Sequence, residues 1–67
     1  MSTCSVNGRE HELEAGETVA RLLERLGVPG RYALVERNRE TVDRSYYGEV
    51  QLAAGDRIIV ARPVAGG

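Results

Sequence analysis

The order of predicted elements indicates an α+β fold of the β-grasp type, in which a mixed sheet of about five strands wraps across one main helix. An Asn-Gly pair near the start predicts a β-hairpin. An amphipathic segment with both ends marked predicts a single helix, and a run rich in β-branched residues predicts a last strand that returns to the sheet. A flexible C-terminal tail ending in Gly-Gly completes the expected architecture.

The first hairpin is predicted by Asn7-Gly8, because both central residues of the tightest hairpin turns take positive φ. Thr3–Val6 and Arg9–Leu13 are then expected to pair as antiparallel strands. This register places Cys4 opposite His11 on the same face of the sheet.

The helix follows the hairpin and carries signals at both ends. Thr18 is suited to cap its N-terminus, Gly27 supplies a left-handed residue beyond its C-terminus, and Pro29 prevents its continuation. Apolar residues at the spacing i, i+3, i+4 and i+7 form one stripe, which predicts packing on a sheet: Val19, Leu22, Leu23 and Leu26.

Two further short strands are predicted after the helix. They cover Tyr32–Arg37 and Glu40–Arg44 and are joined by a turn at Asn38-Arg39. The segment 45–56 is expected to be irregular, with a short 3₁₀ piece or turn, and with Leu52 reaching into the core.

The last strand is predicted within RIIVARP, residues 57–63, because it is rich in β-branched side chains. Pro63 ends it, since proline cannot donate to a sheet ladder. We therefore divide the chain into a β-grasp domain, residues 1–62, and a flexible tail, residues 63–67.

Length, composition and charge exclude several classes of protein. With 67 residues, 42% hydrophobic and 28% charged, the sequence is typical of one folded domain. Nine basic and ten acidic residues leave a net charge of −1. The sequence therefore has no excess of positive charge with which to bind nucleic acid or an anionic membrane. We find no signal-peptide pattern at the start and no run long enough to span a bilayer, so we expect a cytoplasmic protein that is monomeric on its own.

Catalytic and metal-binding constellations are hard to assemble from this sequence. Cys4 with His11 is the only candidate nucleophile and base, and we favour a core role for the cysteine and a place at the sheet rim, with its tip in water, for the histidine. A zinc site needs about four ligands, so we expect no bound metal and no catalytic residue. Four carboxylates near the helix entry are interpreted as solubilising and favourable to the helix dipole: Glu10, Glu12, Glu14 and Glu17.

The Gly66-Gly67 ending is the most informative feature of the sequence. Residues without side chains let a carboxylate pass through a narrow channel to a nucleotide in an activating enzyme, because a Cβ would widen the chain and restrict its φ and ψ. Val64 and Ala65 would give small apolar contacts to a groove. Conversion of a terminal carboxylate into a mixed anhydride with AMP would let a sulfur nucleophile form a thiocarboxylate.

Taken together, these motifs resemble the ThiS family, the small ubiquitin-like sulfur carriers of thiamine (thiazole) biosynthesis. The likeness runs through four segments: VNGRE, GETVARLLERLGV, ALVERNRETVDRS and LAAGDRIIVARPVAGG. It implies that Gly67 becomes the adenylate and then the thiocarboxylate. The chain would be a protein cosubstrate rather than an enzyme, with no bound cofactor of its own.

The resemblance also implies partners. A ThiF-type adenylyltransferase would use ATP and magnesium, a persulfide relay would supply the sulfur, and a ThiG-type thiazole synthase would receive it. Ile59 is expected to point away from the helix-packed face and to contact a partner. An isolated surface aliphatic residue is the equally plain interpretation of Ile59.

Other functions share this tail. The small subunit of molybdopterin synthase has the same fold and chemistry, and its members often end in the pattern P-V-x-G-G. A general sulfur donor for cysteine or thionucleoside synthesis is a further alternative. A ubiquitin-like modifier would join its tail to lysines of target proteins, although this chain contains no lysine for self-linked chains. A plain β-grasp interaction module would not need the glycines.

Overall fold

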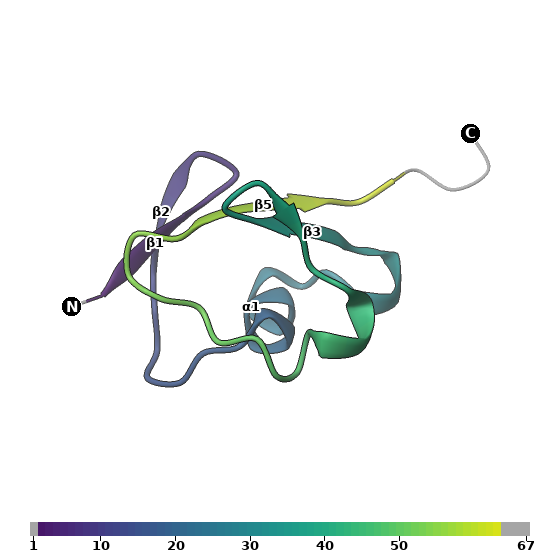
Figure 1. Cartoon of the computed structure of the whole chain (residues 1–67), viewed down its shortest axis with the longest axis horizontal. Helices are drawn as coiled ribbons and strands as arrows, with labels where there is room; N and C mark the ends of the chain where they lie inside the picture. The colour runs from purple at the N-terminus through teal and green to yellow at the C-terminus, as the bar shows by residue number, and fades with distance from the viewer. Residues whose placement is uncertain (1, 64–67) are drawn as a thin grey trace.

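The computed structural model describes residues 2–63 and shows one sheet packed across one helix (Figure 1). The sheet has five strands in the order β2-β1-β5-β3-β4. β1 and β5 are parallel neighbours, and the other pairs are antiparallel, so the sheet is mixed. The predicted β-grasp fold is confirmed. The strand bounds are Thr3–Val6 for β1, Arg9–Glu12 for β2, Leu34–Arg37 for β3, Glu40–Thr41 for β4 and Arg57–Ala61 for β5.

Both hairpins turn through residues with positive φ. Asn7 and Gly8 have φ values of 52° and 82°, and Asn38 and Arg39 have values of 53° and 72°. Asparagine tolerates this region better than most residues because its short polar side chain can bond locally. The predicted register is confirmed as well, since the hairpin of β1 and β2 pairs Cys4 with His11.

Helix α1 spans Val19–Leu26, as predicted. The Thr18 side chain accepts a hydrogen bond from the Arg21 backbone N–H at 3.2 Å, and Gly27 ends the helix with φ 73°. Leu26 was expected in the buried stripe, but it is the last residue of the helix and is 42% exposed. Within residues 2–63 no helix has the length and apolar character needed to cross a bilayer.

The strand predicted from Tyr32 starts two residues later. Tyr32 belongs to a short 3₁₀ helix, η1, which spans Gly30–Tyr32. The Tyr32 N–H donates to the Pro29 carbonyl at 3.0 Å, and the Ala33 N–H donates to the Gly30 carbonyl at 3.2 Å. These tight turns lead the chain from the end of α1 up to the sheet, so β3 begins only at Leu34.

The strand predicted over Glu40–Arg44 is also shorter. β4 contains Glu40 and Thr41, and Arg44 opens a second 3₁₀ helix, η2, spanning Arg44–Tyr46. The Asp43 carboxylate accepts from the Ser45 N–H at 2.9 Å and the Ser45 hydroxyl at 2.7 Å. This local side-chain turn ends the extended backbone.

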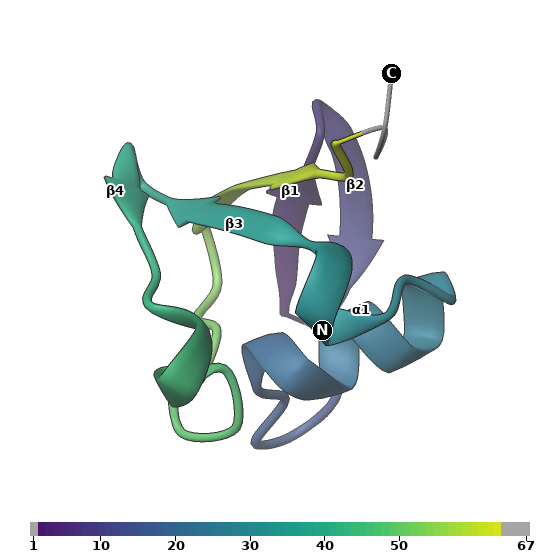
Figure 2. The same cartoon turned by 90° about the vertical axis from the view of Figure 1, so that its right-hand side faces the viewer.

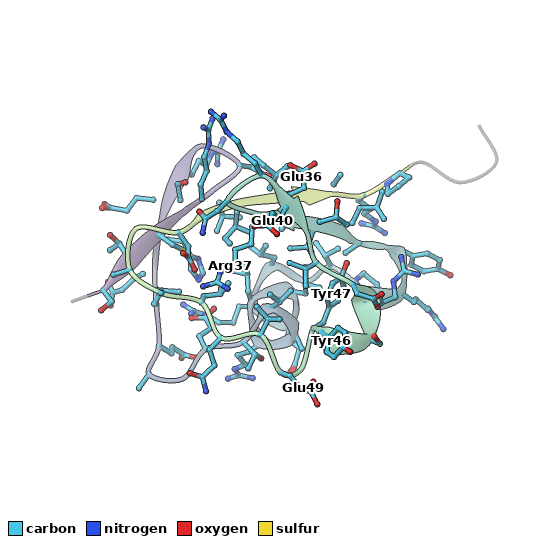
Figure 3. All side chains as sticks on the ribbon, in the orientation of Figure 1. Glu36, Arg37, Glu40, Tyr46, Tyr47 and Glu49 are labelled. Carbon is cyan, nitrogen blue, oxygen red and sulfur yellow. The ribbon has the colours of Figure 1, made fainter. Side chains whose placement is uncertain are left out.

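The core lies between the sheet and α1, as the turned view shows (Figure 2). Tyr47 is on this inner side, whereas Glu36 stands on the opposite face, away from the helix (Figure 3). Tyr47 is buried, and its hydroxyl donates to the Ala33 carbonyl at 2.9 Å. The predicted burial of Leu52 is confirmed. The buried apolar residues are Cys4, Val6, Val19, Leu22, Leu23, Ala33, Val35, Tyr47, Leu52 and Ile58.

We predict that Leu23→Ala lowers the free energy of unfolding by about 2–5 kcal/mol, because Leu23 is 2% exposed and its loss leaves a cavity. Leu26→Ala, on the same helix but half-exposed, is the matched control and should cost clearly less. Urea unfolding followed by circular dichroism measures both. Equal losses in the two variants would show that the buried face of α1 is assigned wrongly.

Candidate functional site

The outer face of the sheet presents an apolar patch on β5 and β3. We use "outer patch" for Ile59, Leu34 and Ala61. Ile58 is fully buried, whereas Ile59 is 38% exposed, as strand alternation predicts. Leu34, 50% exposed, pairs with Ala61 across the two strands. Ile59 is therefore a diagonal neighbour of Leu34 on the same face, so it is not an isolated surface aliphatic residue.

The outer patch lies at the end of β5, from which the chain continues to the predicted tail. β5 ends at Ala61, and the structure describes the chain as far as Pro63. The residues predicted to be modified or recognised lie outside the described residues: Val64, Ala65, Gly66 and Gly67. The described part of the candidate site is therefore the outer patch at the end of β5.

A buried carboxylate occupies the junction of β2 with α1. Glu17 was predicted to be a surface residue, but its side chain is fully buried. Its Oε1 accepts from Arg25 Nη1 at 2.6 Å and from the Glu14 N–H at 2.9 Å. Its Oε2 lies 3.1 Å from Nε2 of His11, so the histidine tip contacts this carboxylate and is not in water as expected. Glu17 thus ties the hairpin to the helix.

Burial and nearby negative charge both act on the Cys4 thiol. Burial raises the pKa of the Cys4 thiol, and the negative charges of Glu17 and Asp56 raise it further. A thiol with a raised pKa stays protonated at neutral pH and is inert. His11 is committed to Glu17, so the structure supports the core role of Cys4.

A second buried carboxylate, Asp56, anchors the start of β5. Its Oδ2 accepts from Arg37 Nε and from the Ala53 N–H, both at 2.8 Å, and its Oδ1 accepts from Asn38 Nδ2 at 3.0 Å. Burial alone would raise the pKa of Asp56, but these hydrogen bonds and the Arg37 charge hold it below its usual value. In the sequence Asp56 stands out only by its place at the end of a predicted turn segment.

Metal coordination has no support in the described part of the chain. Among residues 2–63 no three His, Cys, Asp or Glu side chains gather in an arrangement that would hold a metal ion. The carboxylate of Glu17 contacts His11 through one oxygen and Arg25 through the other.

Fold and site together define a small β-grasp protein with an apolar outer patch at the root of a C-terminal Gly-Gly segment. The sequence model of the ThiS family matches residues 3–67. The chain therefore belongs to the ThiS family.

Solved structures of similar proteins agree with this assignment. The crystal structure of a thiamine biosynthesis protein (ThiS) from Geobacter metallireducens superposes with a TM-score of 0.78 at 28% identity, covering 97% of this chain and 99% of that one. A solution NMR structure of a thiamine biosynthesis protein from the same organism gives a TM-score of 0.76 at 28% identity, with coverages of 97% and 87%.

Two curated relatives are much longer proteins. Thiazole synthases from Paramagnetospirillum magneticum and Magnetococcus marinus are 40% and 42% identical to this chain over 62 residues. That match covers 92% of this chain but only 19% of each relative. The chain is thus similar to one segment of these thiazole synthases and spans about a fifth of their length.

We predict that acid weakens the fold partly through Asp56. Its pKa is lowered in the folded state, so its contribution is present above the ordinary carboxyl pKa of about 4 and is lost as pH falls through the lower folded value. Asp56→Asn should be less stable at neutral pH and should lose less further stability between about pH 5 and pH 3. Urea midpoints measured across this range test the prediction, and parallel curves for the two proteins would contradict it.

Proposed function

We propose that this chain is a sulfur carrier of thiamine biosynthesis and that the carboxylate of Gly67 carries the sulfur. A ThiF-type adenylyltransferase, using ATP and magnesium, would join this carboxylate to AMP. The outer sulfur of a persulfide donor would then displace AMP to form an acyl disulfide, and a thiol would cleave its S–S bond to release the thiocarboxylate and leave a disulfide. A thiazole synthase of the ThiG type would use the thiocarboxylate. The chain acts as a cosubstrate, and the chemistry belongs to its partners.

The chemical logic rests on the leaving group. A free carboxylate is a poor acyl donor because oxide leaves badly, whereas AMP leaves readily from a mixed anhydride. A carrier must therefore present an accessible carboxylate and little else. Two glycines at the end of the chain fit that task, because they offer no Cβ to block entry into an activating site.

The observation that carries the proposal is the extent of the family match. It begins at residue 3 and runs through Gly67, so the Gly-Gly ending lies within the matched region. A plain interaction module would need only the folded domain. The match therefore favours a carrier over a module whose final glycines have no role.

The curated relatives favour the thiazole branch. Both are thiazole synthases, and each contains a segment similar to this chain within a longer polypeptide. Joining two proteins in one chain raises the effective concentration of one for the other, which suits a carrier and its acceptor enzyme. This supports thiazole synthase as the partner over molybdopterin synthase, whose small subunit is the alternative.

Intact mass spectrometry of the natural chain, purified from cells that contain its sulfur-transfer enzymes, tests the proposal. We expect a fraction heavier by the exchange of one oxygen for one sulfur, with the change localised to Gly67 by fragmentation. The same fraction should disappear after incubation with a thiazole synthase and its substrates, and should persist with molybdopterin synthase.

Gly67→Ala is the matched control for that experiment. The variant should fold normally and should lose most of its adenylation, because a Cβ at the reacting residue obstructs the activating site. Full-rate adenylation of Gly67→Ala would contradict the access argument. Absence of any heavier fraction from the unaltered protein, even with a matched activating enzyme and ATP, would contradict the carrier itself.

The outer patch is the proposed docking surface for the activating enzyme. We predict that Ile59→Arg raises the KM for the carrier about tenfold or more, since an apolar contact is replaced by a charge. The free energy of unfolding should change little, because Ile59 is partly exposed and faces Glu36 across the strands.

Leu26→Arg is the control for Ile59→Arg, because Leu26 is similarly exposed but lies on the helix. It should leave the KM for the carrier unchanged in the same adenylation assay. An equal rise in KM for both variants would mean that the surface effect is general and that the outer patch has no special role.

A further inference from the structure

The side chain of Asn7 binds the backbone of β5. Asn7 lies in the turn between β1 and β2, and its Oδ1 accepts from the Val60 N–H at 2.8 Å while its Nδ2 donates to the Val60 carbonyl at 3.1 Å. Its own N–H donates to the Ile58 carbonyl at 2.9 Å. One residue thus supplies both a donor and an acceptor to Val60, an arrangement we call the amide clamp.

The amide clamp extends the pairing of β1 with β5 beyond the end of β1. The parallel register ends at Val6 and Ile58, after which the chain turns into β2. Successive residues of a strand direct their backbone groups to opposite sides. Because Asn7 takes both backbone groups of Val60, these groups face the β1 side, away from β3. Without the clamp they would rely on water, and the end of β5 would be held mainly by β3.

A second turn asparagine holds the other end of β5. Asn38, between β3 and β4, also has positive φ, and its Oδ1 accepts from the Arg57 N–H at 2.9 Å. Its Nδ2 donates to Asp56. Figure 1 shows both hairpin turns beside β5. Asn38 therefore binds Arg57, the first residue of β5, whereas Asn7 binds Val60, the residue before the last.

We propose that Asn7 is a positioning residue for the sulfur-transfer reaction. The amide clamp holds Val60 from the β1 side, one residue before β5 ends, and so it restrains the part of the strand that precedes the tail bearing Gly67. This inference rests on the proposed carrier function. Asn7 would then serve both to form the hairpin turn, where its φ is positive, and to hold the end of β5.

The physical reason is the entropy of delivering the carboxylate. Without the clamp Ala61 still pairs with Leu34 of β3, but the end of β5 is held from one side only and opens more often. Whenever it is open, more residues separate the remaining paired strand from Gly67. The effective concentration of a tethered group falls with tether length roughly as the −3/2 power, and loss of direction adds a further penalty. The carrier would dock equally well, but its carboxylate would reach the adenylation site less often.

Asn7→Gly tests this role with little change to the turn. Glycine accepts positive φ without a side chain, and Gly-Gly is itself a favoured pair in tight hairpin turns. Asn38→Gly is the matched control, because it removes the equivalent asparagine from the other turn and releases only the start of β5. Both variants are assayed at a temperature at which circular dichroism shows them fully folded.

Two measurements are made on each protein: amide hydrogen exchange at Val60, and steady-state adenylation with a ThiF-type adenylyltransferase and ATP. In Asn7→Gly we expect exchange at Val60 to accelerate about tenfold or more, and kcat to fall about three- to tenfold. KM for the carrier should stay within about twofold, because the outer patch is intact. Asn38→Gly should be less stable but should keep both kcat and KM.

Asn7→Asp provides a partial rescue. In this variant one carboxylate oxygen still accepts from the Val60 N–H. The other oxygen stands where Nδ2 was and cannot donate to the Val60 carbonyl, so that hydrogen bond is lost. Its kcat should fall between those of the wild-type protein and Asn7→Gly. A kcat at the level of Asn7→Gly would mean that the acceptor half of the clamp contributes nothing, which contradicts the proposed two-bond clamp.

The outcomes separate this inference from the proposed function. Suppose the wild-type chain is adenylated. An unchanged kcat in Asn7→Gly, or equal losses of kcat in Asn7→Gly and Asn38→Gly, would then overturn the positioning role alone. Failure of the wild-type chain to be adenylated overturns the carrier function and the positioning role with it. A selective loss of kcat in Asn7→Gly supports both.

Discussion

The insertion of β5 between β1 and β3 is the constraint on which the rest of the structure depends. Both hairpins precede β5 in the sequence, yet only β5 joins them into one sheet. Parallel pairing with β1 needs a long connection, and here that connection includes α1 and both 3₁₀ helices. The sheet, the packing of α1 against it and the outer patch are therefore complete only when β5 has paired with β1 and β3.

Local chemistry made much of this fold predictable. Asn7-Gly8 and the caps of α1 act through φ preferences and neighbouring hydrogen bonds, and these depend on a few adjacent residues. Glu17 and Asp56 could not be recognised as buried, because their partners come from distant segments and a carboxylate near a turn or a cap is usually exposed. The sequence contains one indication that Glu17 is buried, namely its position directly before Thr18, the residue that caps α1.

The candidate site was predictable to different degrees. Alternation along β5 was enough to place Ile59 on the outer face. Its neighbour Leu34 was not foreseen, because the diagonal contact depends on the register between β3 and β5. The amide clamp was hidden for the same reason: an Asn-Gly pair indicates a turn, and only the fold shows that the Asn7 side chain spans the gap to Val60.

The burial of Cys4 has a consequence for the proposed carrier function, in which Gly67 would bear an activated acyl group. An acyl adenylate reacts with amines and thiolates, and such groups on the carrier's own surface would compete with the intended acceptor. The sequence contains no lysine, and its one thiol is enclosed in the core with a raised pKa. The chain thus offers neither a lysine amine nor an exposed thiolate to an acyl adenylate at Gly67, which would preserve the activated end for transfer.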